Sequence, residues 1–106
     1  MVAPGEIYEC DFGTPMGHEA GFRRPAVVIS PAQLNQHGIC LLLPITRTRR
    51  GYPTHVELDG VLPVTCYVQC ELIRAVSTTR LIARRGAIDI VTTSAIRQVL
   101  SRLIAL

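Results

Sequence analysis

Apolar residues recur along the chain at two spacings, one typical of strands and one typical of a helix. Residues 5–12 alternate, with Tyr8, Cys10 and Phe12 on one face, which predicts a half-exposed first strand. The runs 26–29 and 39–45 are short and almost continuously apolar, as buried strands are. Residues 54–58 alternate again before an Asp59-Gly60 turn signal. The first half of the chain is therefore predicted to be mostly β.

The longest predicted strand runs from Thr65 to Val76. Its apolar residues fall on even positions, and Tyr67, Gln69 and Glu71 share the other face. We therefore expect a phenol, an amide and a carboxylate on a surface that the core does not use. Residues 80–90 are predicted to form short extended pieces.

The C-terminal residues predict an amphipathic helix. Residues 92–94 offer N-cap side chains, Arg97 and Arg102 lie off the apolar face, and that face contains Ile96, Val99, Leu100, Leu103 and Ile104. Residues 13–21, with one Pro and three Gly, predict a long loop, and residues 30–35 a short turn or helix. With no repeat or linker, residues 1–106 form a single mainly β domain with helices.

Composition agrees with a globular protein. The 106 residues are 48% hydrophobic and 18% charged, and the longest apolar runs are far shorter than a membrane span. Acids at Glu6, Glu9 and Asp11 stand where a signal peptide needs basic residues, so a cytoplasmic location is expected. The four cysteines, at 10, 40, 66 and 70, show no metal-type pairing and are predicted to be buried thiols.

Charge is distributed unevenly. Residues 1–20 contain four acids and no basic residue, whereas residues 21–106 contain eleven arginines and four acids, a formal charge of +7. There is no lysine, which a genome rich in G and C would also produce. Arg is nonetheless well matched to phosphate oxygens, so a nucleic acid is a candidate partner.

Arg24 is the most constrained of these arginines. Pro25 follows it and restricts its backbone to an extended conformation at the start of a core strand. A guanidinium held in this way suits binding of a phosphate or carboxylate. The structural alternative is an ion pair that orders the strand.

Two loops carry further candidates. His18 and Glu19 lie in the loop 13–21, where the apolar pattern does not require them. Arg47, Arg49 and Arg50 precede Tyr52 in a basic loop that is suited to contact RNA through charge and base stacking, the alternative being a solvated turn.

Taken together, these residues resemble the MazF/PemK family of toxin endoribonucleases, which includes Kid-like members. The resemblance covers nearly the whole chain, and its order and spacing are more specific than any one fragment. The fragments are Gly5-Glu6-Ile7-Tyr8, Gly17-His18-Glu19, Arg24-Pro25-Ala26-Val27-Val28, Pro44-Ile45-Thr46, Gly51-Tyr52-Pro53 and Glu71-Leu72-Ile73-Arg74.

The resemblance implies an SH3-like β-barrel with appended helices, usually a homodimer. It implies cofactor-free, metal-independent cleavage of single-stranded RNA and neutralisation by a MazE-type antitoxin. The family pattern maps catalytic roles to Arg24 and Thr46, and in Kid-like members also to His18 and Glu71. Two positions depart from it: Gln69 stands where Kid-like toxins have Arg, and Leu72 where many members have Gln.

This resemblance leads to a catalytic hypothesis. The substrate's 2′-hydroxyl would attack the phosphorus and leave 2′,3′-cyclic phosphate and 5′-hydroxyl ends. Glu71, or its rival His18, would be the base, Arg24 would stabilise the phosphorane and Thr46 would orient a phosphate oxygen. His18 would protonate the leaving oxygen. RNA contacts are expected from Glu19, Arg47, Arg49, Arg50, Tyr52 and Gln69.

Three other functions remain to be compared with this one. A CcdB-type gyrase poison shares the fold but depends on an aromatic C-terminal tail, and this chain has no Trp. An SH3-like binding module needs an aromatic groove, whereas only 5% of the residues are aromatic. A catalytically weakened family member that binds RNA or antitoxin is the third, because Gln69 removes a cation.

Overall fold

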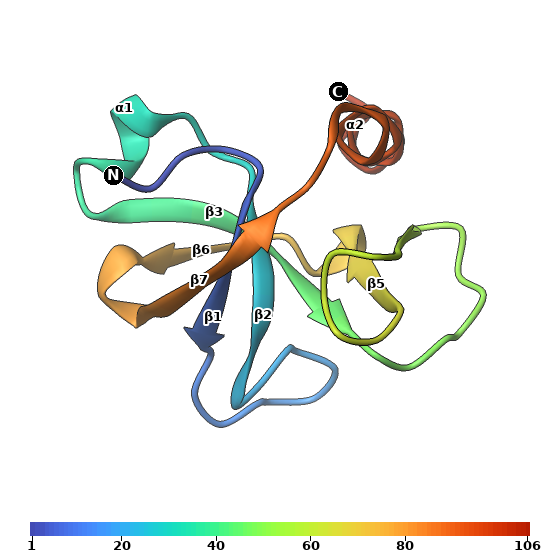
Figure 1. The fold of residues 1–106 in the computed structure, drawn as a ribbon, viewed down its shortest axis with the longest axis horizontal. Coiled ribbons are helices and arrows are strands. Elements are labelled where there is room, and N and C mark those ends of the chain that lie inside the picture. Colours follow the sequence, from blue (N-terminus) through green and yellow to red (C-terminus); the bar gives the residue numbers. More distant parts are fainter.

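The computed structural model describes residues 1–106 and contains one curled antiparallel sheet (Figure 1). Its strand order is β4-β5-β3-β2-β1-β7, and β6 pairs separately with β3. No ladder joins the outer strands β4 and β7, so the sheet is barrel-like but open, which agrees with the predicted mainly β fold. The strands are β1 (Glu6–Asp11), β2 (Arg23–Val28), β3 (Ile39–Thr46), β4 (His55–Leu58), β5 (Cys66–Gln69), β6 (Arg74–Ser77) and β7 (Leu81–Ala87). The helices are α1 (Ala32–Asn35) and α2 (Ile90–Leu103), with 3₁₀ turns η1 (Cys70–Leu72) and η2 (Thr78–Arg80).

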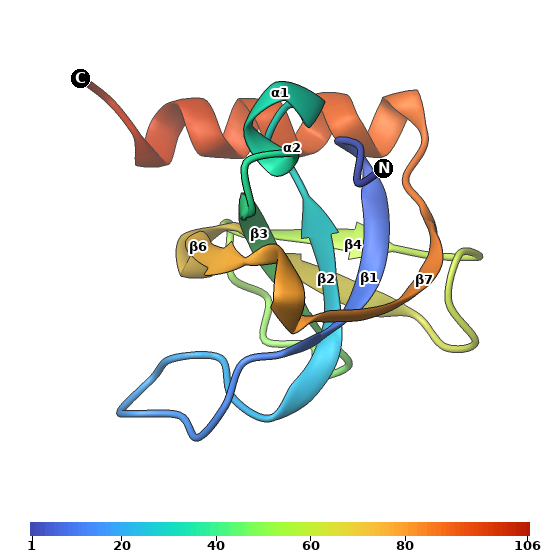
Figure 2. The ribbon, with the colours of Figure 1, turned by 90° about the vertical axis from the view of Figure 1, so that its left-hand side faces the viewer.

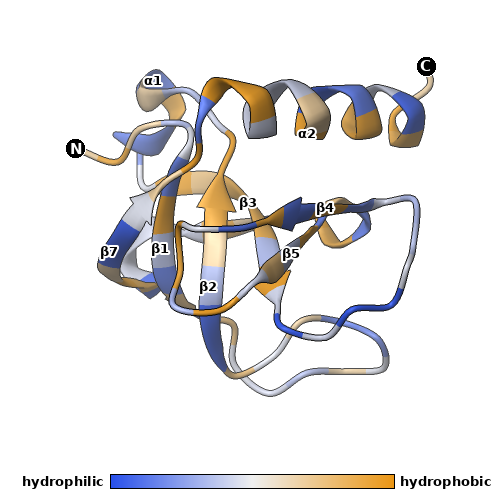
Figure 3. Ribbon diagram, turned by 45° about the vertical axis from the view of Figure 1, so that its right-hand side comes forward, coloured by the Kyte–Doolittle hydropathy of each residue, from blue (hydrophilic) through white to orange (hydrophobic).

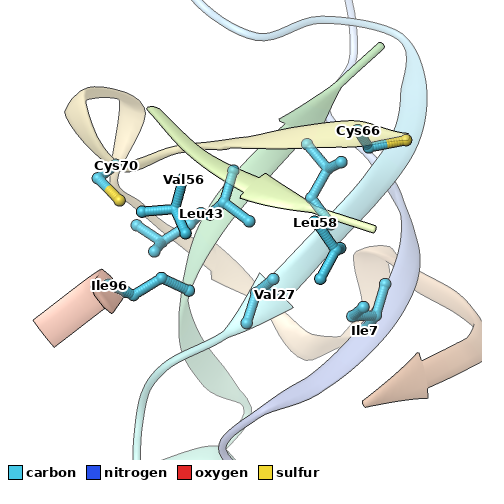
Figure 4. Close-up of a cluster of buried hydrophobic side chains, with 10 residues drawn as sticks. Ile7, Val27, Leu43, Val56, Leu58, Cys66, Cys70 and Ile96 are labelled. Atoms are coloured by element: carbon cyan, nitrogen blue, oxygen red, sulfur yellow. The ribbon is translucent and has the colours of Figure 1, made fainter. Parts of the chain in front are cut away.

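The sheet has a hydrophobic cluster on each of its two faces. The first cluster contains Val27 and Leu43 and is covered by Ile96 of α2 (Figure 4). The second contains Ala26 and Leu42. Successive residues of β2 and β3 thus enter opposite clusters, which explains why these strands are continuously apolar. Strand β1 is more buried than predicted for the same reason, because Ile7 belongs to the first cluster and Cys10 to the second.

Helix α2 crosses the top of the sheet above the strand ends (Figure 2). Its N-cap is Asp89, whose side chain accepts a hydrogen bond from the Thr92 N–H, so the predicted caps at 92–94 are wrong. The helix begins at Ile90, whose exposed side chain does not belong to the apolar face. The helical spacing of apolar residues therefore begins several residues after the first residue of the helix. No helix of this fold has both the length and the apolar character needed to cross a membrane.

The predicted strand from Thr65 to Val76 is wrong. Strand β5 ends at Gln69, η1 turns the chain, and β6 then pairs with the opposite end of β3. Gln69 is only 4% exposed, so β5 is buried at this position on the face opposite the first cluster as well. The alternation of apolar and polar residues in the sequence cannot show that both faces of a strand are buried.

Strand β7 is one continuous strand and not the short pieces predicted for 80–90. Its register against β1 shifts at two places, between Ile7 and Tyr8 and between Glu9 and Cys10. Such irregularities interrupt the alternation of faces, so the sequence pattern looks broken although the strand is not.

All four cysteines are free and buried, as predicted. Burial raises the pKa of Cys10 and of Cys70 to about 11. These thiols therefore remain protonated at neutral pH and serve as small core residues.

Candidate functional site

The site is built around the first residues of β2. Phe22, with φ 59°, exchanges backbone hydrogen bonds with the other end of the loop 13–21, which closes that loop immediately before the strand. Arg24 then pairs with Cys10 of β1. Its side chain leaves the sheet on the face of the second cluster, to which Cys10 and Ala26 belong.

Arg24 and Thr46 belong to adjacent strands and line the same cleft. The β2–β3 ladder ends at the pair Ala26–Pro44, and Arg24 and Thr46 each lie two residues beyond it, on the face of Ala26 and Pro44. Thr46 pairs with Tyr67 of β5. Paired side chains share a face of the sheet, so Tyr67 also lies on that face. We call these three residues, Arg24, Thr46 and Tyr67, the Arg24 row.

Gln69 lies diagonally across from Thr46, in the neighbouring row of the same face. It pairs with His55 of β4, and its diagonal Cβ separation from Thr46 is about 7–8 Å by sheet geometry. Three of the predicted site residues, Arg24, Thr46 and Gln69, thus lie on one face of the sheet, but Gln69 is buried there and not exposed as predicted. The Thr46 hydroxyl oxygen accepts a hydrogen bond from the Thr48 N–H at 3.2 Å, which leaves its proton available to a ligand.

Glu71 belongs to η1, and its carboxylate reaches the start of β4, where both of its oxygens have partners. Oε1 accepts from the Thr54 hydroxyl and Oε2 contacts Nε2 of His55, each at 2.9 Å. Burial acts to raise the pKa of Glu71, but the hydrogen bonds from His55 and Thr54 outweigh it and lower that pKa. Sequence reasoning missed His55; its only signal was a polar residue at the start of an alternating strand.

Glu71 should make the stability of the fold depend on pH. Because its pKa is lower in the folded chain, its contribution is complete above the unfolded-state pKa of about 4.3 and is lost as the pH falls through the folded value. We expect Glu71→Gln to lose less unfolding free energy than wild type between pH 5 and pH 3, measured by urea denaturation. Glu57→Gln, on the exposed side of β4, is the control and should match wild type. Equal losses in all three proteins would contradict this role.

His18 and Glu19 remain apart from the Arg24 row. Both are exposed in the loop 13–21, which projects beyond the lower end of β2 (Figure 2). Glu19 accepts a hydrogen bond from the Met16 N–H at 3.1 Å, whereas His18 makes no side-chain hydrogen bond. The structure thus places His18 on a neighbouring loop and in no contact with Glu71.

A cleft of about 610 Å³ opens at the ends of β2 and β3. Arg24 and Thr46 line it together with Arg23, Arg47 and Arg85. Only Arg85 among these arginines is paired, with its Nη2 3.3 Å from Oε2 of Glu9. The sequence did not single out Arg85, because only the irregular register of β7 brings it to this end of the sheet. Four guanidiniums around one cleft favour an anionic ligand.

The loop after β3 continues this basic surface. Arg49 and Arg50 are exposed but do not line the cleft. The Tyr52 ring is 52% exposed and packs against His55 with 5.1 Å between ring centroids. Figure 3 shows hydrophilic colouring both on the lower end of β2 and along this loop.

Chemically, this surface offers an unpaired guanidinium, hydroxyl donors and an ionised carboxylate. Those are groups that bind a phosphate and stabilise negative charge on it. No three His, Cys, Asp or Glu side chains are grouped so that they could hold a metal ion.

Comparison with known proteins gives a consistent result. The sequence profile described as "PemK-like, MazF-like toxin of type II toxin-antitoxin system" matches residues 3–105. The endoribonuclease MazF9 of Mycobacterium tuberculosis is 33% identical over 99 residues, which covers 84% of each chain. The crystal structure of MazF from Deinococcus radiodurans superposes with a TM-score of 0.91 at 29% identity, covering 99% of this chain and 97% of that one. A MazE–MazF complex from the same organism gives a TM-score of 0.84 at 29% identity, with 99% and 96% coverage.

Proposed function

The chain belongs to the PemK-like, MazF-like toxin family, and from that premise we propose that it is an endoribonuclease toxin of a type II toxin–antitoxin system. The observation that carries the proposal is that Arg24 and Thr46, from adjacent strands, line one cleft together with three further arginines. A permanently charged donor and a hydroxyl donor on adjacent strands suit two oxygens of one phosphate group.

The proposed substrate is single-stranded RNA. The cleft and the loop after β3 supply charge for backbone phosphates, and the exposed ring of Tyr52 supplies a surface for base stacking. Arg47 is the link between the two, since it both lines the cleft and begins the loop. Arg49, Arg50 and Glu19 then contact bases or phosphates beyond the cleft.

The proposed reaction is internal transesterification. The 2′-oxygen forms a bond to phosphorus and loses its proton to a base, the bond from phosphorus to the 5′-oxygen breaks, and that oxygen takes up a proton. The products are a 2′,3′-cyclic phosphate and a 5′-hydroxyl. Arg24 stabilises the charge on the phosphorane, and Thr46 donates to one of its oxygens. Arg24 is assigned this electrostatic role and no proton transfer, because the planar guanidinium fork matches the geometry of phosphate oxygens.

In this proposal Glu71 and His18 carry out the two proton transfers, one from the 2′-hydroxyl and one to the leaving 5′-oxygen. The lowered pKa of Glu71 keeps it ionised at neutral pH, so it can accept a proton after releasing its hydrogen bond to Thr54. His18 is exposed and makes no side-chain hydrogen bond, which suits it to protonate the leaving oxygen or to replace Glu71 as the base.

The proposed protein partners are a second copy of the chain and a MazE-type antitoxin. Complexes of MazE with MazF from Deinococcus radiodurans support the second partner. An acidic antitoxin segment would be attracted to the same arginines as RNA, so the two ligands should compete.

The decisive experiment is to incubate the purified protein with an oligoribonucleotide in excess chelator. We expect discrete cuts that carry cyclic-phosphate and 5′-hydroxyl ends, identified by mass spectrometry. Binding of RNA without cleavage would instead indicate a catalytically weakened family member, the alternative suggested by Gln69 in place of an arginine. Cleavage that requires added metal would contradict the proposed mechanism.

A further inference from the structure

Two buried polar atoms on paired residues beside the Arg24 row have no hydrogen-bond partner. They are Nδ1 of His55 and Oε1 of Gln69. The two residues are directly opposite in the β4–β5 ladder, so their side chains leave the same face of the sheet. The side chain of His55 is 3% exposed and Gln69 is 4% exposed, so neither atom is satisfied by bulk water. A buried polar atom without a partner is costly, and two such atoms on opposed residues indicate that these side chains interact.

The other nitrogen of the ring determines how they interact. Nε2 lies 2.9 Å from Oε2 of Glu71, whose ionised carboxylate can only accept, so Nε2 carries the proton. In the neutral ring Nδ1 is then an acceptor. A half turn of the Gln69 amide exchanges the positions of its oxygen and its NH₂ group, and an NH₂ group is a donor that Nδ1 can accept from. The relay that this permits runs from Gln69, which donates to His55, to His55, which donates to Glu71.

We propose that His55 is a positioning residue, which links the Glu71 carboxylate to the Gln69 amide and thereby fixes Gln69 diagonally across from Thr46. The proposal deepens the proposed function and rests on it. Gln69 supplies no charge, so its contribution to phosphate or base binding depends on its orientation. Two residues of the loop after β3 contact the relay. Thr54 donates a hydrogen bond to the other oxygen of Glu71, and the ring of Tyr52 packs on His55.

The relay can be tested without RNA, by nitrogen NMR of the histidine rings in the full chain. His55 is assigned by the loss of its signals in His55→Gln. We expect Gln69→Leu to shift the Nδ1 resonance of His55 while Nε2 stays protonated, and Glu71→Gln to shift Nε2. An Nδ1 resonance that does not move in Gln69→Leu would overturn the relay. Because this measurement needs no cleavage, it decides the relay even if the proposed function fails.

Its effect on the reaction is tested by a double-mutant cycle. We expect Gln69→Leu and His55→Phe each to lower kcat about tenfold with KM little changed, and the double variant to lose no more than either single one. Thr54→Val is the matched control, since it removes a hydrogen bond to Glu71 but leaves the relay intact. Additive losses, or losses no larger than that of Thr54→Val, would overturn the positioning role. Circular dichroism identifies any variant that is not folded. If the variants that contain His55→Phe do not fold, the kcat of Gln69→Leu is compared with that of Thr54→Val alone.

Discussion

Arg24→Ala is expected to lose about 10²- to 10³-fold in RNA cleavage rate while remaining folded. Arg24 is half-buried at the rim of the cleft and forms no ion pair, so its removal leaves no partner unsatisfied. Its loss removes one of the guanidiniums that line the cleft together with Thr46. The measurement is single-turnover cleavage of an oligoribonucleotide, with thermal unfolding recorded on the same samples.

The matched control for this variant is Arg97→Ala on α2. Arg97 is exposed and makes no salt bridge, so the substitution changes the net charge equally but away from the Arg24 row. Arg24→Lys gives a second comparison, because it keeps the charge but not the planar fork and should fall between wild type and Arg24→Ala. If Arg24→Ala cleaves as fast as Arg97→Ala, the site has been placed wrongly.

Leu43→Ala is expected to reduce the unfolding free energy by about 2–5 kcal/mol. Leu43 is fully buried in the first cluster, where it pairs with Val27 of β2 (Figure 4). Truncation leaves a cavity that strands paired on both sides cannot easily close. For a domain of this size the loss is a large part of the total stability. Urea denaturation at 25 °C, followed by circular dichroism, measures it.

A surface position on the same sheet provides the comparison. Ile82 of β7 is 49% exposed, and Ile82→Ala should change the unfolding free energy by less than about 1 kcal/mol. Similar losses for the two variants would mean that the first cluster is not the main source of stability.

Much of the fold was predictable from the spacing of apolar residues. The runs that became β2 and β3 and the apolar face of α2 carry strong local signals, since burial on two faces or along one stripe leaves a clear pattern. The break after Gln69 carries no such signal. It depends on where β3 ends and on which strand pairs with each of its halves, and both are properties of the whole sheet.

The candidate site was predictable only in part, for a similar reason. Arg24 was indicated by the constraint that Pro25 imposes on it, Thr46 was added by the resemblance to a family, and both line the cleft. Arg85 and His55 were missed, because the first reaches the cleft through an irregular ladder and the second gains interest only from its contact with Glu71. Single-residue patterns contain no information about such long-range neighbours.

Strand β3 pairs with three other strands, β2 along one edge and β5 and β6 along the other. Its backbone hydrogen bonds therefore cannot open locally without separating both halves of the sheet, so its amides belong to the unit that exchanges hydrogen only through global unfolding. Thr46 is the last residue of that strand. The hydroxyl proposed to hold the phosphate is thus attached to the strand whose amides we expect to exchange most slowly, whereas the loop that begins at Arg47 lies outside the strands.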